Sequence, residues 1–200
     1  MATVRDVRPG EYVPEADQRV VLHRVPWDHY EAHLAMRGDR PVPRISYLRG
    51  TLELMSPSRE HERITSWLGR LIEVFAEERG IELSPYRSWT LEHPEEAGAE
   101  PDECYIVGDD QSKTRPDLVI EVTWTSGGLD KLAVYESLGI SEVWFWIEGR
   151  IEIHLLRAGR YERSDTSSWL AGIDLVQLCA LVEIPKLGDA KRAYRAALQR

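Results

Sequence analysis

The 200 residues of this chain include 42% hydrophobic and 30% charged side chains, a balance that excludes a disordered protein and is typical of one globular domain. No apolar run approaches the roughly 20 residues that a membrane-spanning helix needs, and the N-terminus has no apolar stretch of signal-peptide type, so we expect a cytoplasmic protein. The net charge of −9 argues against binding nucleic acid through a broadly basic surface, so such binding would need a local basic patch or a bound metal ion.

The first quarter of the chain predicts a loose arm followed by a strand, a helix and a hairpin. Residues 1–18 are polar and contain Pro and Gly, which is typical of an arm without regular structure. A short strand is expected at Arg19–Val25, and a helix from Trp27 to about Met36. Gly38–Pro43 has the composition of a turn. Two apolar segments then flank Arg49-Gly50-Thr51, which predicts a hairpin over 47–55.

The clearest helix follows Ser58. Its apolar residues recur at the i, i+3, i+4 and i+7 spacing of one buried stripe. They are Ile64, Trp67, Leu68, Leu71, Ile72, Phe75 and Ala76. Gly80 is the expected C-terminal cap of this helix.

The rest of the chain predicts alternating strands and helices. Three strands are expected at Ile81–Thr90, Glu103–Val107 and Leu118–Trp124, a helix at about Leu129–Leu138, strands at Val143–Ile147 and Ile151–Leu155, one or two further short strands, and a last helix near Asp189–Gln199. Cys104 and Cys179 have no metal-ligand spacing and indicate buried thiols in a reducing compartment. The order favours a single α/β (α+β) domain over residues 1–200, with a mixed central sheet flanked by helices, an N-terminal hairpin and extra C-terminal strands.

Carboxylates at two strands carry the predicted chemistry. Pro101-Asp102 and Pro116-Asp117 each open a strand, where proline is tolerated and a side chain is available at the strand end. Glu121 instead interrupts the apolar strand LVIEVTW. Burying a lone carboxylate costs several kcal/mol unless a cation or hydrogen-bond donors offset it. A metal ion at Glu121 is one solution, and an arginine or backbone donors are the other.

Asp102 and Glu121 together suit a magnesium or manganese ion. Such an ion prefers oxygen ligands and keeps several waters, so one or two carboxylates and a substrate phosphate suffice. A nearby lysine would orient the attacking water or stabilise charge on the phosphate. Lys131, at the start of the helix after Glu121, is the candidate. Lys113 lies in a polar loop and is interpreted as a solvated charge.

Several of these motifs resemble a known family. The stretches LRGTLELMSPSREHERI, Pro101-Asp102, RPDLVIEVTWTSGGLDKLAVYESLGI and SEVWFW, spanning residues 45–147, resemble the restriction endonuclease family of the Uma-two type, within the PD-(D/E)XK nuclease superfamily. The resemblance implies a metal-dependent, often dimeric nuclease core. The superfamily pattern has a lysine two residues after the acid, where this chain has Thr123. In the resembling family the lysine comes from the following helix, which matches Lys131.

Other residues have two interpretations each. His61, at the start of the Ser58 helix, either holds a substrate phosphate or a water near the metal, or hydrogen-bonds to a neighbouring loop. Glu60 and Glu62 are possible third carboxylates, although acids in a first helical turn also complement the helix dipole. Glu53, in the hairpin, is another possible third carboxylate. Trp144 and Trp146 are interpreted as core residues rather than as a surface on which nucleic-acid bases stack.

We therefore predict a metal-dependent DNA endonuclease that forms a homodimer. A catalytically silent binding or dimerisation module on the same fold is one alternative. A metal-dependent phosphodiesterase acting on RNA or a small nucleotide is another, which the acidic charge would suit better.

Overall fold

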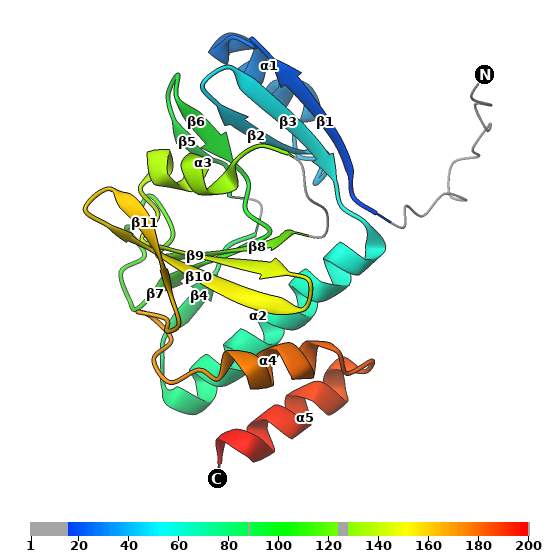
Figure 1. Cartoon of the computed structure of the whole chain (residues 1–200), viewed down its shortest axis with the longest axis vertical. Coiled ribbons are helices and arrows are strands. Elements are labelled where there is room, and N and C mark those ends of the chain that lie inside the picture. Colours follow the sequence, from blue (N-terminus) through cyan, green and yellow to red (C-terminus); the bar gives the residue numbers. More distant parts are fainter. Residues whose placement is uncertain (1–15, 88, 124–127, 200) are drawn as a thin grey trace, which may run out of the picture.

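The structure, a computed structural model, describes residues 16–87, 89–123 and 128–199 (Figure 1). Its strands form two sheets, and the five helices found in these residues pack against them. The predicted helix ends are set by capping. Ser58 accepts a hydrogen bond from His61 N at the start of α2 (Arg59–Arg79), and Gly80 ends it with a left-handed backbone at φ 66°.

The first sheet is built mainly from the N-terminal part of the chain. Its order is β1-β3-β2-β6-β5, with every pair antiparallel. The strands are β1 (Gln18–His23), β2 (Arg44–Leu48), β3 (Thr51–Ser56), β5 (Leu91–His93) and β6 (Ala97–Ala99). The helix α1 (Trp27–Arg37) covers one face, where Tyr30, Tyr47 and Leu52 form a small core.

The second sheet is mixed. Its order is β11-β10-β9-β8-β7-β4, and only β8 and β9 are parallel among its described pairs. The strands are β4 (Leu83–Pro85), β7 (Glu103–Val107), β8 (Leu118–Thr123), β9 (Glu142–Ile147), β10 (Arg150–Arg157) and β11 (Arg160–Ser164). The two central strands β8 and β9 carry apolar side chains on both faces, because helices cover the sheet on both sides.

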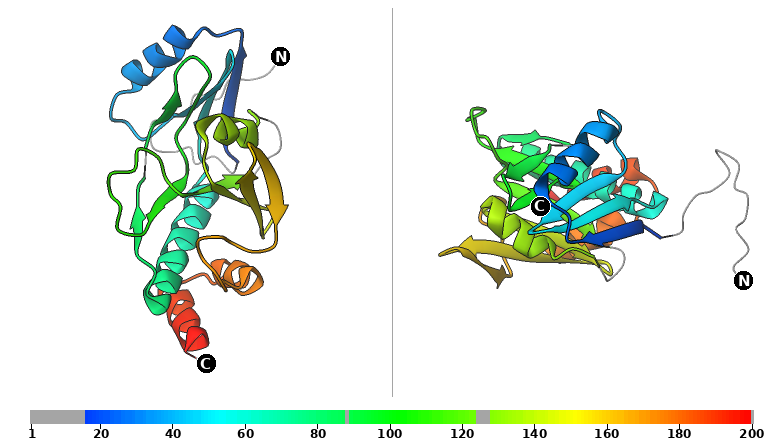
Figure 2. Two further views of the ribbon diagram at one scale, coloured as in Figure 1. Left: turned by 90° about the vertical axis from the view of Figure 1, so that its left-hand side faces the viewer. Right: turned by 90° about the horizontal axis from the view of Figure 1, so that it is seen from above.

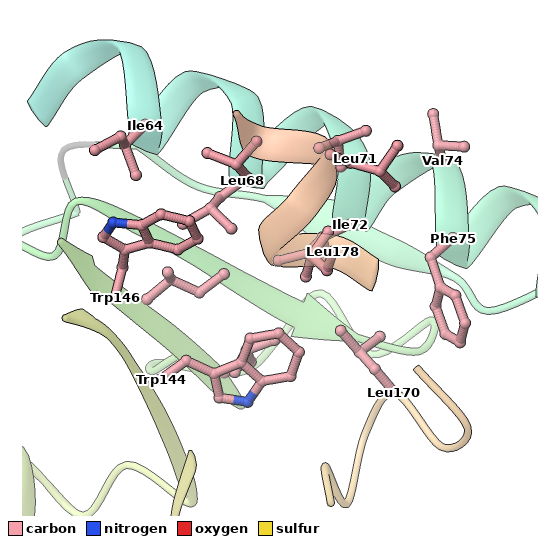
Figure 3. Packing of buried hydrophobic residues seen from close by; sticks show 14 of the residues in the cluster. Ile64, Leu68, Leu71, Ile72, Val74, Phe75, Trp144, Trp146, Leu170 and Leu178 are labelled. Atoms are coloured by element: carbon pink, nitrogen blue, oxygen red, sulfur yellow. The ribbon is translucent and has the colours of Figure 1, made fainter. Parts of the chain in front are cut away.

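The main core lies between the second sheet and three helices. The long helix α2 crosses the sheet, and α4 (Leu175–Val182) and α5 (Leu187–Leu198) pack beside it (Figures 1 and 2). Figure 3 shows Trp144 and Trp146 of β9 pointing toward α2, where both are almost fully buried. The prediction that these tryptophans belong to the core is confirmed. On the opposite face, α3 (Lys131–Leu138) packs Val134, Tyr135 and Leu138 against the sheet.

The predicted fold class is confirmed, and the structure differs from the prediction in two elements. The predicted strand at 81–90 is only the three-residue β4, because the chain then leaves the second sheet and forms β5 and β6 in the first. The predicted hairpin is confirmed as β2 and β3, which lie within the five-stranded sheet. The apolar segment of α4 was not predicted as a helix. Residues 1–15 of the predicted loose arm fall outside the described residues, and its last residue, Gln18, is the first residue of β1.

Among the described helices, none is both long enough and apolar enough to cross a membrane.

Candidate active site

Asp102 immediately precedes β7 and lies against the neighbouring strand β8. Asp102 is 4% exposed, and its Oδ2 accepts a hydrogen bond of 2.7 Å from the backbone N of Val122. Oδ1 forms an ion pair with the guanidinium of Arg44 on β2. The antiparallel pairing of β7 with β8 thus places Asp102 beside the residue that follows Glu121.

His61 joins Asp102 to the segment before β1. Its imidazole is completely buried, with Nε2 3.0 Å from Asp102 Oδ2 and Nδ1 3.0 Å from Asp17 Oδ2. Asp17 also accepts a hydrogen bond from the backbone N of Ser58. Burial opposes ionisation of Asp17, but the bonds from His61 and Ser58 outweigh it and lower its pKa to about 2. Because His61 is enclosed, the geometry favours its interpretation as a residue bonded to a neighbouring segment rather than as a phosphate ligand.

Glu121 meets Lys131 on the opposite face of β8 from α2. Its side chain is 3% exposed on the face that α3 covers. Lys131 Nζ lies 3.3 Å from Glu121 Oε1 and donates a hydrogen bond of 2.9 Å to Ser46 Oγ on β2. The Tyr135 hydroxyl donates to the same Glu121 oxygen. Tyr135 is fully buried, and burial together with the adjacent Glu121 charge raises its pKa well above the ordinary value, so the hydroxyl remains a donor.

Glu53 lies opposite Ser46 in the β2–β3 pair and faces the start of α3. It is 2% exposed, and Oε2 accepts a hydrogen bond of 3.0 Å from the backbone N of Leu129. Gly128 passes close to this carboxylate: a Cβ there would lie 2.9 Å from Arg19 Nη1 and would also collide with Glu53. Glu53 therefore fixes the segment that leads into α3, and a side chain at 128 would have to displace the ends of Arg19 and Glu53.

Two cavities flank the candidate residues. The first, which we call the Glu121 cavity, has a volume of about 360 Å³ and is lined in part by Arg19, Glu53, Glu121, Lys131 and His154. The second, the Asp102 cavity, has about 350 Å³ and is lined in part by Arg37, Arg44, Glu62, Arg87 and Asp102. Asp102 and Glu121 lie on adjacent strand segments, as predicted, but each carboxylate lines its own cavity and is neutralised by its own basic residue.

The donor set of the Glu121 cavity fits a hard divalent cation. Four carboxylates line it, on Glu53, Glu121, Asp130 and Glu152, against the two cations Arg19 and Lys131. No group of three or more His, Cys, Asp or Glu in the described part of the chain is arranged to hold a metal ion. An ion held by one or two carboxylates, with water or substrate oxygens completing its shell, is compatible with this arrangement. The shared site of Asp102 and Glu121 stays a prediction.

The remaining predicted residues lie at the edge of the site or outside it. Glu62 is half exposed and pairs with Arg44 at 2.8 Å, and Glu60 pairs with Arg63. The interpretation of Lys113 as a solvated charge is wrong, because Nζ donates to Asp117 at 2.7 Å and to the carbonyl of Val107. The side chain of Thr123 and residues 124–127 of the predicted loop lie outside the described residues.

Sequence reasoning missed four residues that contact the candidate side chains. They are Asp17, Arg44, Ser46 and Tyr135. For Tyr135 a signal existed: it lies four residues after Lys131, so the two share one face of the helix that follows the Glu121 strand. Arg44 and Ser46 lie 58 and 56 residues before Asp102, and Asp17 lies in the arm that polar composition marked as loose. Nothing local in the sequence indicated the partners of these three residues.

Comparisons with known proteins identify the family and the fold of this chain. The model of the Uma2 family, described as "Putative restriction endonuclease", matches residues 27–183. A crystal structure described as that of "a putative nuclease belonging to DUF820" from Anabaena variabilis has a TM-score of 0.50 at 13% sequence identity, and the match covers 85% of this chain and 99% of that chain. At this identity the likeness shows a shared fold. The sequence matches no curated protein.

Proposed function

This chain belongs to the Uma2 family, and from that premise we propose that it hydrolyses phosphodiester bonds in DNA with the help of a divalent metal ion. The observation that carries the proposal is the meeting of Lys131 with Glu121 at a cavity lined by an excess of carboxylates. A buried carboxylate beside an ammonium group on a cavity wall is the pair that phosphodiester hydrolysis needs for holding a cation and for stabilising developing charge.

Lys131 is held ready to act on a phosphate. Its ammonium group is fixed by Ser46 on one sheet and by Glu121 on the other, so it retains its position without substrate. A preorganised cation at the cavity wall stabilises the negative charge that develops on the phosphate oxygens in the transition state. Its location on α3 supports the proposal that this helix supplies the lysine that position 123 lacks.

Glu121 would hold the metal ion in its cavity, and a share of Asp102, which lines the other cavity, in holding the same ion is the part of the proposal that Asp102→Ala tests. Tyr135 and Lys131 both contact Oε1 of Glu121, and no contact is recorded for Oε2 within the described residues. The bound ion would lower the pKa of a coordinated water and neutralise the scissile phosphate. Asp102 is held in place by Arg44, by the backbone of Val122 and by His61.

The proposal is tested by plasmid nicking. Wild-type protein is incubated with supercoiled DNA and magnesium, manganese or EDTA, beside Asp102→Ala and the surface variant Glu136→Gln. We expect nicking with either metal, none with EDTA, none with Asp102→Ala, and unchanged nicking with Glu136→Gln. Nicking that is equal in wild type and in Asp102→Ala contradicts the proposal. The absence of cleavage of DNA, RNA and small nucleotides by a well-folded wild type favours the silent binding module.

A further inference from the structure

Three arginines from distant segments line the Asp102 cavity, and the proposed function gives no role to two of them, Arg37 and Arg87. Arg37 is the last residue of α1, Arg44 is the first of β2, and Arg87 lies between β4 and β5. The planar guanidinium group presents its N–H donors in a fork that fits the oxygens of a phosphate group. The fold thus gathers at one cavity three side chains of the type best suited to holding a phosphate.

One short segment of the chain anchors all three arginines. Each is paired with a carboxylate from residues 100–103 that is at most 4% exposed. The pairs are Arg37 with Glu100 at 2.6 Å, Arg44 with Asp102, and Arg87 with Glu103 at 2.9 Å. Four consecutive residues span at most about 10 Å, so the anchors lie close together. A guanidinium group that is already held by a buried carboxylate loses little further freedom when it binds a ligand.

These pairs leave N–H donors without partners. Arg87 uses only Nε, and no hydrogen bond is recorded for its two Nη groups within the described residues. Arg37 donates from Nε to the carbonyl of Gly38 and from Nη1 to Glu100, and none is recorded there for its Nη2. Both arginines can therefore donate to a ligand without giving up the carboxylate that holds them.

The buried acceptors of the cavity wall, on Glu100 and Asp102, are by contrast already engaged. Glu100 accepts from Arg37, Thr90 Oγ1 and the backbone N of Ile45, and Asp102 contacts Arg44, His61 and the backbone N of Val122. Glu62, which is half exposed, pairs with Arg44 at 2.8 Å. Positive and negative side chains balance in number here, but the groups without partners are mostly donors, and donors are what the oxygens of an anion require.

Thr65 of α2 adds a hydroxyl group to the same cavity. It is 2% exposed, and its Oγ1 has no hydrogen-bond partner within the part of the chain that the structure describes. A threonine in a helix commonly bonds its hydroxyl to a carbonyl one turn earlier. Leaving a buried hydroxyl unpaired is unfavourable, so an oxygen bound in the cavity would supply the partner that this group lacks.

The Asp102 cavity adjoins the Glu121 cavity. Val122 lines the Glu121 cavity, and its backbone N donates to Asp102 Oδ2 at 2.7 Å, so one hydrogen bond joins the walls of the two cavities. The volume of about 350 Å³ lies within the range of pockets that hold small ligands. A polymer that places one phosphate at Lys131 would therefore have a second binding site beside it.

We propose that the Asp102 cavity binds a second, non-scissile phosphate of the nucleic-acid backbone, held by Arg37, Arg87 and Thr65. The source of this phosphate rests on the proposed function, whereas the site for an anion rests on the donors of the cavity alone. A phosphate contact of this kind fixes the position of the strand without reading its bases. In a chain of net charge −9, it also supplies the local site that nucleic-acid binding requires.

DNA binding without cleavage tests the site. Fluorescence anisotropy of a labelled duplex in EDTA gives the affinities of wild type, Arg87→Gln and the control Arg192→Gln over a range of salt concentrations. Arg192 is an exposed arginine of α5, which lies at the opposite end of the molecule from α1 (Figure 1). We expect Arg87→Gln to bind about tenfold more weakly, because a charge-assisted hydrogen bond is lost, and to reduce the dependence of log affinity on log salt by about 1. Arg192→Gln should match wild type.

Two further variants keep the test decisive if Arg87→Gln is poorly folded. Thr65→Val removes only the hydroxyl, so the melting temperature should stay unchanged or rise, because that hydroxyl has no partner to lose. Duplex binding by Thr65→Val should nonetheless weaken by about threefold or more. Glu62→Gln removes a half-exposed negative charge beside the site, so it should tighten duplex binding.

The outcomes separate this site from the proposed function. Weaker binding by Arg87→Gln or Thr65→Val, with Arg192→Gln unchanged, supports the site whether or not the wild type cleaves DNA. Wild-type affinity in both variants, or an equal loss in Arg192→Gln, overturns it and leaves the proposed function intact. Isothermal titration with inorganic phosphate distinguishes the sources of the anion. Phosphate binding that Thr65→Val abolishes, while both variants keep the duplex affinity of wild type, overturns the assignment to nucleic acid.

Discussion

His61 Nε2 lies 3.0 Å from Asp102 Oδ2, inside the protein, while Nδ1 of the same ring contacts Asp17. One imidazole thus joins the start of α2 to the strand end that carries Asp102 and to the segment before β1. The orientation of Asp102 depends on residues that lie 41 and 85 positions earlier in the chain. This arrangement is the basis of the first two predictions.

Replacing His61 should cost both stability and activity. In His61→Ala two buried carboxylates lose a shared partner, and breaking a buried charged contact of this kind costs about 3 kcal/mol. Denaturant unfolding measures the loss, and plasmid nicking measures whether Asp102 still functions. His29→Gln is the control, because its side chain is exposed. An unchanged free energy of unfolding would show that the three side chains do not interact in solution.

Asp17 should make the fold sensitive to acid. Its pKa is about 2 in the folded protein against an ordinary value of 3.8, so its contribution to the free energy of unfolding is complete above about pH 4 and is lost as the pH falls toward 2. Asp17→Asn should lack this part of the pH dependence. Denaturant unfolding at several acidic pH values measures it. Parallel curves for wild type and Asp17→Asn would contradict the assigned contact with His61.

Lys131→Ala should abolish most cleavage while the protein stays folded. Removing one preorganised charge-stabilising donor typically costs on the order of 10²-fold in rate. Ser46→Ala should have a smaller effect of the same kind, because it removes one of the two partners that hold the ammonium group. Single-turnover cleavage with saturating metal measures both. Full activity of Lys131→Ala, in a preparation where Asp102→Ala is inactive, would show that Lys131 only pairs with Glu121.

A divalent metal ion should stabilise the folded protein. Binding to the native state alone adds about 2.7 kcal/mol at a hundredfold excess over Kd. Thermal melts with and without manganese should therefore differ for wild type and for the surface variant Glu136→Gln. The difference should disappear in Glu121→Gln. A melting temperature that manganese leaves unchanged in all three proteins would argue that this chain has no such site.

Gly128→Ala should disturb the site more than the fold. Its Cβ would meet Arg19 and Glu53, and Glu53 would then release the backbone of Leu129 ahead of α3. We expect a large loss of cleavage with a small change in melting temperature. Gly188→Ala in α5 is the matched control, since a Cβ there meets only the end of Arg192 at 3.4 Å. Equal rates of cleavage by the two variants would show that Glu53 does not help to position Lys131.

The sequence predicted those parts of the fold that local patterns determine. The apolar stripe and caps of α2 and the continuous apolar strands β8 and β9 were found with nearly correct ends. The short strands β4, β5 and β6 were not, because three residues carry too little periodicity to distinguish a strand from a loop. Which of the two sheets a short strand joins depends on distant partners, such as the pairing of Tyr47 with Gly98.

The sequence likewise predicted only those parts of the candidate site that local patterns determine. Glu121 was conspicuous as a charge within an apolar strand, and its contact with Lys131 followed from the short connection between them. Its other partner, Tyr135, was interpreted only as a core residue of α3, although its position four residues after Lys131 places both on one helix face. The ion pair between Arg44 and Asp102 joins the two sheets, and no local sequence pattern indicates a contact of that kind. Homodimerisation and the DNA substrate stay predictions.

Lys131 donates to Ser46 on β2 of the first sheet and contacts Glu121 on β8 of the second, so a single amine spans the junction between them. A tilt of one sheet against the other by little more than the length of a hydrogen bond would separate the ammonium from one of its two partners. On the proposed function, the rate of cleavage should therefore depend on the angle between the sheets. Any contact that holds the two sheets at a fixed angle, even one along the outer strands far from the cavity, should then change the rate of cleavage.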